Sequence, residues 1–304
     1  MRKWFQRVIT GHATSAYNSN RQQFGGGYRA AGQRLPGAGC LANPRLLMAL
    51  LMMGGALAYY YMGTTEYENP FTGRKQRLAM PTAEEEIAMG LQSAPQMIRE
   101  MGGEHPDTQA QALVDQVGEK LINTTAVKET PYKFDFHLLR DDQTINAFAL
   151  PGGQIFITSA LFKLLENEDQ LAGVLGHEIG HVVGRHSNEQ MAKGKLWQGL
   201  AQGAGVLLSD GQGAGGQQMA QMVASMITMK YGREDELESD ALGVKFLLQA
   251  GYDPEAMIGV MEILAKHAGG GGQPEFMSTH PNPGNRAEKI RELIGQLRGE
   301  RPSR

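Results

Sequence analysis

The sequence predicts an α+β protein in which a mainly α-helical domain with a small β-sheet is preceded by one transmembrane helix. Three observations lead to this fold class. An uncharged apolar run occupies residues 46–62, and apolar and polar residues alternate over 132–138. From about Ala160 onward, apolar residues recur mainly at helical spacing. A chain of 304 residues is long enough for one or two domains with a sizeable core.

The first 45 residues are basic and contain no Asp or Glu; the first acidic residue of the chain is Glu66. This segment is rich in Gly, Arg and Gln and lacks apolar periodicity, which predicts a disordered tail. The formal net charge of the whole chain is −3, so its charge balance does not indicate a nucleic-acid partner. The single cysteine, Cys40, excludes an internal disulfide framework and a Cys-rich metal site.

Residues 46–62 read LLMALLMMGGALAYYYM and are expected to form a transmembrane anchor. Their length falls within the range of about 17–25 residues that spans a bilayer. Arginine precedes the run and Tyr59–Tyr61 end it, as the positive-inside rule and the aromatic belt require. Two alternatives stay open: a buried core helix, and a cleaved signal with an A-x-A site at 56–58. The long preceding tail favours an uncleaved anchor.

After the anchor we expect an extended linker at 63–81 and one folded domain at 82–298. Thr82 and Glu85 form a capping-box pattern that opens a helix running to about Glu100. The other expected elements are a helix at 108–122, a strand at 132–138, two strands at 146–150 and 154–158 around a Pro-Gly-Gly turn, and Gly-rich loops at 203–216 and 269–272.

A metal-binding pattern lies in segment 173–186, which reads GVLGHEIGHVVGRH. His177 and His181 are four residues apart, so on a helix both imidazoles project from one face and can bind one metal ion. Glu178 follows the first histidine, where its carboxylate can reach a water at the metal without being a ligand. This HExxH arrangement is typical of zinc peptidases. His186 is displaced around the helix and is expected to be a poor ligand.

A catalytic zinc needs a third protein ligand and an open position, and the acidic stretch 233–240 supplies candidates. Glu236 and Asp240 are four residues apart and share a helix face. We expect Glu236 to bind the metal and Asp240 to hydrogen-bond a ligand histidine, which fixes its tautomer. Glu234 and Glu238 lie two residues to either side of Glu236. Their side chains are expected to face away from the metal, so that replacing either one with alanine would have almost no effect.

The combination resembles the membrane-associated gluzincin zinc metallopeptidases typified by HtpX and the CAAX prenyl protease. Those proteins pair a V-L-x-H-E-x-x-H helix with an R-x-x-E-x-x-x-D helix, and Arg233, Glu236 and Asp240 match the second pattern. The segment NAFALPGG at 146–153 also looks like the strand and turn that line the cleft in this family, and STHP at 278–281 looks like the family's C-terminal His-Pro segment. The resemblance extends from about residue 82 to 297 and is closest to the single-anchor periplasmic or mitochondrial quality-control members.

The resemblance implies a zincin-type peptidase domain with one zinc ion per chain, held by His177, His181 and Glu236. Glu178 would act as the catalytic base, taking a proton from water and delivering it to the leaving amine. His280 would donate to the oxyanion, and Arg286 would lie behind the ligands with Asp240. The strand residues that would bind substrate backbone to backbone are Asn146, Ala147, Phe148 and Ala149.

The function expected from these features is a membrane-anchored zinc metalloendopeptidase that hydrolyses misfolded or membrane-associated proteins in protein quality control. A chaperone-like or scaffold protein that retains the zinc site is the alternative, but the intact ligands and base favour the enzyme. The expected location is the bacterial inner membrane with the peptidase domain in the periplasm. An Arg-rich, acid-free leader also fits the mitochondrial inner membrane, and a cleaved signal would leave a soluble periplasmic domain.

Overall fold

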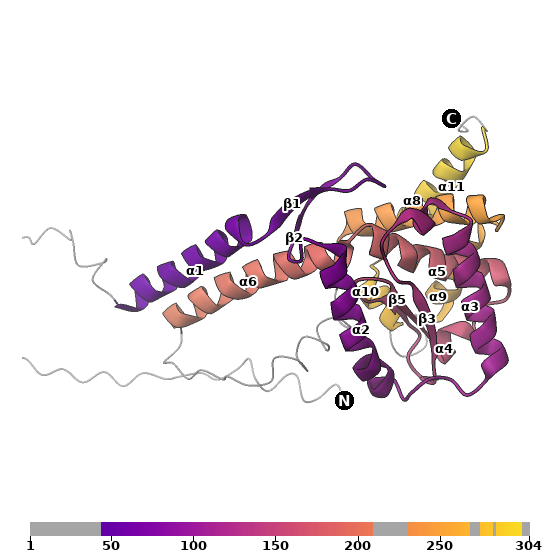
Figure 1. The fold of residues 1–304 in the computed structure, drawn as a ribbon, viewed down its shortest axis with the longest axis horizontal. Coiled ribbons are helices and arrows are strands. Elements are labelled where there is room, and N and C mark those ends of the chain that lie inside the picture. The colour runs from indigo at the N-terminus through magenta and orange to yellow at the C-terminus, as the bar shows by residue number, and fades with distance from the viewer. Residues whose placement is uncertain (1–43, 209–229, 268–273, 282–283, 300–304) are drawn as a thin grey trace, which may run out of the picture. The chain divides into compact units, whose positions relative to one another are not determined.

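The computed structural model confirms the predicted fold class, since the chain is mainly helical with two small sheets (Figure 1). It describes residues 44–208, 230–267, 274–281 and 284–299, so nearly all of the basic tail lies outside the described residues. The helices are α1 (Pro44–Met62), α2 (Ala83–Glu100), α3 (Thr108–Asn123), the 3-10 helix η2 (Ala126–Glu129), α4 (Ser159–Phe162), α5 (Glu168–Val183), α6 (His186–Leu208), α8 (Arg233–Ala250), α9 (Ala256–His267), α10 (Glu275–Thr279) and α11 (Arg286–Leu297). The strands are β1 (Thr65–Glu68), β2 (Lys75–Leu78), β3 (Asp135–Leu139), β4 (Ala147–Ala149) and β5 (Gln154–Thr158).

The larger sheet has the order β3-β5-β4, with β3 parallel and β4 antiparallel to the central β5. The predicted turn between β4 and β5 contains Gly152 and Gly153, whose φ angles of +84° and +115° favour glycine. A Cβ on Gly152 would lie 2.4 Å from the Cα of Ile87 in α2, so this turn packs under α2 only without a side chain. Strand β3 begins three residues later than predicted, and the segment before it is held at the turn, where the backbone N–H of Lys133 donates to the Gly152 carbonyl.

Helix α5 lies at the centre of the fold and packs directly against α8 (Figure 1). Glycines on α5 allow the close approach. A Cβ on Gly180 would lie 2.9 Å from the carbonyl oxygen of Ser239 in α8, and one on Gly176 would lie 2.7 Å from Leu247. Because protein interiors are close-packed, larger residues at these positions would separate the two helices that carry the HExxH pattern and the acidic stretch.

Residues 63–81, expected to be an extended linker, contain the antiparallel β1–β2 hairpin, which packs on the end of α5. The side-chain amide of Asn69 donates to the carbonyl of Val183 at 2.8 Å, and that of Gln76 donates to the carbonyl of Gly184 at 2.8 Å. The last carbonyls of a helix have no partner within it, so these two buried amides satisfy the end of α5. The strand sequences TEYE and KQRL are too polar to show a buried face.

Helix α1 begins two residues before the predicted apolar run and lies alongside α6 (Figure 1). Gly199 of α6 faces Ala56 of α1, where an added Cβ would lie 2.4 Å from the Ala56 Cβ. Within the described ranges, α1 is the one helix long and apolar enough to cross a membrane. Only 6% of its apolar window is buried, which does not fit the alternative of a buried core helix.

Candidate metal centre

The two histidines of the HExxH pattern lie on one face of α5, one turn apart, and are both buried. Their Nε2 atoms face each other at 3.0 Å. Burial lowers the pKa of His181 well below its usual range, although the neighbouring Glu236 carboxylate acts in the opposite direction. The ring is therefore neutral, which is the form that binds a metal.

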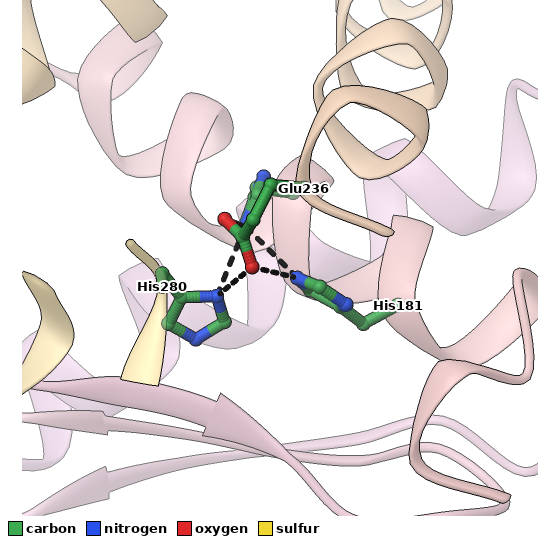
Figure 2. A group of neighbouring side chains, drawn as sticks. His181, Glu236 and His280 are labelled. Carbon is green, nitrogen blue, oxygen red and sulfur yellow. Dashed lines mark hydrogen bonds and ion pairs between the residues drawn. The ribbon is translucent and has the colours of Figure 1, made fainter. Parts of the chain in front are cut away.

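The side chain of Glu236 reaches the same point from α8. The side chain of His280, the residue directly after α10, reaches it as well (Figure 2). The carboxylate oxygens of Glu236 lie 3.5 Å from His181 Nε2 and 3.6 Å from His177 Nε2. His280 Nδ1 lies 3.1 Å from Glu236 Oε1 and 3.3 Å from His177 Nε2. The four candidate ligand atoms, one from each of these side chains, all lie within 4.8 Å of one another.

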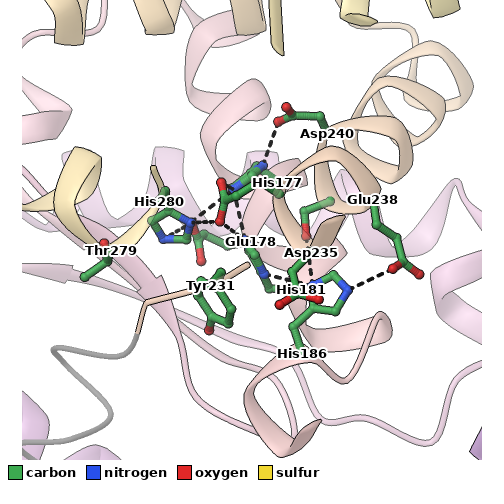
Figure 3. Close-up of polar contacts among 12 residues, drawn as sticks. His177, Glu178, His181, His186, Tyr231, Asp235, Glu238, Asp240, Thr279 and His280 are labelled. Carbon is green, nitrogen blue, oxygen red and sulfur yellow. Dashed lines mark hydrogen bonds and ion pairs between the residues drawn. The ribbon is translucent and has the colours of Figure 1, made fainter. Parts of the chain in front are cut away.

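Asp240 lies behind His177 on the next turn of α8 after Glu236. Its Oδ1 is 3.0 Å from His177 Nδ1 (Figure 3), and Arg286 donates to its two oxygens from Nε and Nη2 at 2.7 Å each. Burial would raise the pKa of Asp240, but the Arg286 guanidinium prevails and lowers it. An ionised carboxylate only accepts hydrogen bonds, so the proton of His177 is on Nδ1 and the lone pair of Nε2 points at the cluster.

The side chain of Glu178 projects from α5 towards His280 and is fully buried (Figure 3). Its Oε1 is 3.6 Å from His280 Nε2, and neither of its oxygens has a hydrogen-bond partner. Burial raises the pKa of the Glu178 carboxyl, although the nearby His280 and His177 oppose this shift. A buried carboxylate that accepts no hydrogen bond from the described residues is costly, so its presence beside the cluster indicates a position kept for a reacting group.

The strand expected to bind substrate, Ala147–Ala149, is β4, at one edge of the larger sheet. Asn146 precedes it and is fully buried, and neither atom of its side-chain amide has a hydrogen-bond partner. The backbone N–H of Phe276 in α10 donates to the carbonyl of Ile145 at 3.1 Å. The His-Pro segment and the start of β4 are thus joined next to the cluster.

The sequence did not predict two aromatic contacts of the site, those of Tyr231 and His186 with His181. The ring of Tyr231 stacks on His181 with centroids 3.9 Å apart. His186, treated as part of a continuous helix, in fact follows a break. Helix α5 ends at Val183, and Arg185 has a φ of +57°, which turns His186 back so that its Nδ1 lies 2.9 Å from His181 Nδ1.

Glu234 is exposed as expected, whereas Glu238 is not. The side chain of Glu238 is only 11% exposed, and its Oε2 lies 3.3 Å from His186 Nε2. Glu238 thus faces away from the candidate ligand atoms as expected, but it packs against His186 instead of solvent. Helical spacing correctly kept it out of the cluster of ligand atoms but could not show which residue packs against it.

The model of peptidase family M48 matches residues 108–294, which is more than half of the chain. The chain belongs to peptidase family M48. It is 32% identical over 226 residues to the beta-barrel assembly-enhancing protease of Escherichia coli, covering 70% of this chain and 45% of that protein. It is 29% identical over 270 residues to the mitochondrial metalloendopeptidase OMA1 of Schizosaccharomyces pombe, covering 85% and 76%. The chain thus spans about half the length of the bacterial relatives it matches first.

Peptidases of family M48 are zinc-dependent, and the donor set fits one zinc ion per chain. Two ligands about 2.1 Å from a tetrahedral zinc lie about 3.4 Å apart, and the cluster's closest ligand atoms are 3.0–3.6 Å apart. Lone pairs that face each other inside a protein repel unless a cation lies between them. Within the described ranges this is the one group of His, Cys, Asp and Glu side chains with such spacing.

The contact of Asp240 with His177 predicts unequal losses of zinc affinity. Asp240→Ala should weaken zinc binding by roughly 10–100-fold, because a ligand histidine loses the partner that orients it. Glu236→Ala should weaken binding further, because a candidate ligand atom itself is removed. Competition with a chromogenic chelator measures both affinities. Wild-type affinity in Asp240→Ala would contradict the positioning role of Asp240.

Proposed function

We propose that this protein is a membrane-anchored zinc metalloendopeptidase that hydrolyses misfolded or membrane-associated proteins in protein quality control. The observation that carries the proposal is the cluster of His177, His181 and Glu236 beside the unpartnered carboxylate of Glu178. Family membership supports the peptidase chemistry. The printed names of the relatives, a beta-barrel assembly-enhancing protease and mitochondrial metalloendopeptidases, support the quality-control setting.

In this proposal His177, His181 and Glu236 hold the zinc, which when bound acidifies a water and polarises the scissile carbonyl. Glu178 takes the proton from the attacking water at its carboxylate and delivers it to the leaving amine. Its raised pKa suits this exchange, since a base is most effective when its pKa lies near the working pH. Asp240 and Arg286 keep the ring of His177 in position from behind.

His280 is proposed as the donor to the oxyanion. If its Nδ1 lone pair faces the cluster, its proton is on Nε2, which has no hydrogen-bond partner and lies 3.6 Å from Glu178. Such a donor is free to bond a developing negative charge. The position of Nδ1 among the four ligand atoms also supports ligation by His280, and the variants described below separate the two roles.

The substrate is proposed to be an extended or unfolded protein segment that pairs with β4 at Ala147, Phe148 and Ala149. An edge strand offers backbone N–H and C=O groups to an added strand, and β4 is such a strand. Only an extended chain can form this ladder, so folded proteins would be poor substrates. No nucleic acid is expected as a partner.

We propose four segments: a basic tail at 1–45, an anchor at 46–62, a connecting segment at 63–81 and a peptidase domain at 82–298. The apolar helix α1 supports attachment to a membrane. The finer placement that we propose is the bacterial inner membrane with the peptidase domain in the periplasm. The similarity to OMA1 proteins keeps the mitochondrial inner membrane as the alternative.

Three substitutions should separate metal binding from turnover of an unfolded test protein. His177→Ala should lose both, because a ligand is removed. Glu178→Gln should keep about one zinc per chain and lose most turnover, because the amide cannot accept the proton. His280→Ala should keep zinc and lose about 10²–10³-fold in turnover if it donates to the oxyanion.

Zinc content and proteolysis of the same preparations decide between the roles. Loss of zinc from His280→Ala would assign that residue as a ligand instead of a donor. Full activity of Glu178→Gln would overturn the assignment of the base, and full activity of metal-free wild-type protein would end the zinc-peptidase proposal. Wild-type function of Glu178→Gln in cells, despite lost proteolysis, would favour the chaperone-like alternative.

The anchor is tested by extraction of membranes with alkaline carbonate. A bilayer-spanning helix resists this treatment, because its apolar side chains stay in the hydrocarbon core. We expect the protein in the pellet with a mature N-terminus upstream of Leu46. A soluble product that begins at Tyr59 would show that the run is a cleaved signal.

A further inference from the structure

A buried polar chain leads away from His181 on the side opposite the metal cluster. His181 Nδ1 lies 2.9 Å from His186 Nδ1, and His186 Nε2 lies 3.3 Å from Glu238 Oε2 (Figure 3). Both histidine side chains are fully buried. Glu238 in turn lies 3.0 Å from the guanidinium of Arg74. The mechanism proposed above uses none of His186, Glu238 and Arg74.

The order of these groups determines where the protons lie. The Glu238 carboxylate has no proton to donate, so we place the proton of the His186 ring on Nε2, the nitrogen 3.3 Å from it, although the two atoms are not aligned as a hydrogen bond. His186 Nδ1 then has a lone pair, and the nitrogen 2.9 Å away, His181 Nδ1, must donate to it. The hydroxyl of Ser239, 3.2 Å from His186 Nδ1, can donate to the same lone pair. This leaves the lone pair of His181 on Nε2, which faces the metal cluster.

Arg74 holds the outer end of this chain in place. It lies between β1 and β2 and makes ion pairs with Glu189 at 2.6 Å, Asp235 at 2.7 Å and Glu238 at 3.0 Å. The three acidic side chains are at least 89% buried, and Arg74 itself is 21% exposed. An arginine shared by three largely buried carboxylates holds all three side chains in place.

The backbone at the end of α5 is shaped to place His186 there. A Cβ on Gly184 would lie 2.5 Å from His186 Nε2, so the ring fits only because residue 184 is glycine. Arg185 adopts the left-handed conformation with φ +57°, which is uncommon for a residue with a side chain. Such local strain persists only where surrounding contacts enforce it. Here Arg185 is held by an ion pair with Glu86 at 3.0 Å.

We propose that His186, supported by Glu238 and Arg74, is a positioning residue that fixes the tautomer and orientation of His181 for metal binding. The inference rests on the proposed zinc site and deepens it. In this arrangement His186 and Glu238 orient the ring of His181, as Asp240 and Arg286 orient the ring of His177. It also makes the β1–β2 hairpin, which directly follows the α1 helix, a contributor to the metal centre. Outer partners of this kind orient the ligands that touch the metal.

Two glutamates on α8 provide a matched test. Glu238 belongs to the buried polar chain of side chains, whereas Glu234, one helical turn before it, is exposed. Zinc affinity is measured by chelator competition on the full-length protein in detergent. Glu238→Ala should lose roughly 10–100-fold in affinity, whereas Glu234→Ala should match the wild type. Glu238→Gln should lose less than Glu238→Ala, because the amide oxygen still accepts from His186 Nε2.

The second readout is the position of the proton on His181 in metal-free protein, observed by ¹⁵N NMR of labelled histidine. The signals of His181 are assigned from their absence in His181→Asn. Wild type and Glu234→Ala should show His181 protonated on Nδ1 alone, and Glu238→Ala should show a mixture of tautomers. If Glu238 merely stabilised the fold, Glu238→Ala would lower the melting temperature of the metal-free protein but leave His181 protonated on Nδ1 alone.

Unchanged zinc affinity and a single His181 tautomer in Glu238→Ala would overturn the inference, as would a wild-type His181 protonated on Nε2. The proposed function fails by a different result. Wild-type protein that binds no zinc would end the peptidase proposal, while the tautomer measurement on the same metal-free protein would still decide the role of His186.

Discussion

The convergence of lone pairs on one buried point is the constraint on which this structure depends. His177, His181 and Glu236 come from two helices and point at one another inside the protein, with His280 completing the group. The Arg286 guanidinium lies 2.9 Å from one Glu236 oxygen and balances its charge, but the facing lone pairs of the buried histidines have lost their hydration and repel one another. A bound cation reverses that balance, so zinc affinity and the stability of this region are coupled.

The rest of the fold provides the closeness and the orientation that the cluster needs. The α5 glycines let α8 approach until the backbone of Ser239 would touch a side chain at position 180. Asp240 with Arg286 holds one ligand histidine, and His186 with Glu238 faces the other. The amides of Asn69 and Gln76 close the end of α5. Except for His186, which follows His181 by five residues, these contacts come from segments distant in sequence, so the centre forms only when the domain is assembled.

The periodic elements were predictable, because their signals are local. The capping box at Thr82 and the turn at Gly152–Gly153 appear where the sequence places them. Helical spacing also brought Glu236 and Asp240 to the face that meets α5. The β1–β2 hairpin could not be predicted, because its strands are polar. What holds it in place is its hydrogen bonds to the carbonyls at the end of α5, which are distant in sequence. Gly184 is a local signal for the end of α5, but the sequence does not show that Arg185 adopts a left-handed conformation and turns His186 back onto His181.

The most direct test of the central claim is an anomalous difference map, recorded at the zinc absorption edge, from crystals of the zinc-loaded protein. We expect one peak per chain, with His177 Nε2, His181 Nε2 and a Glu236 oxygen each about 2.0–2.2 Å away. A peak held instead by His186 and Glu238, or no peak near α5 and α8, would contradict it.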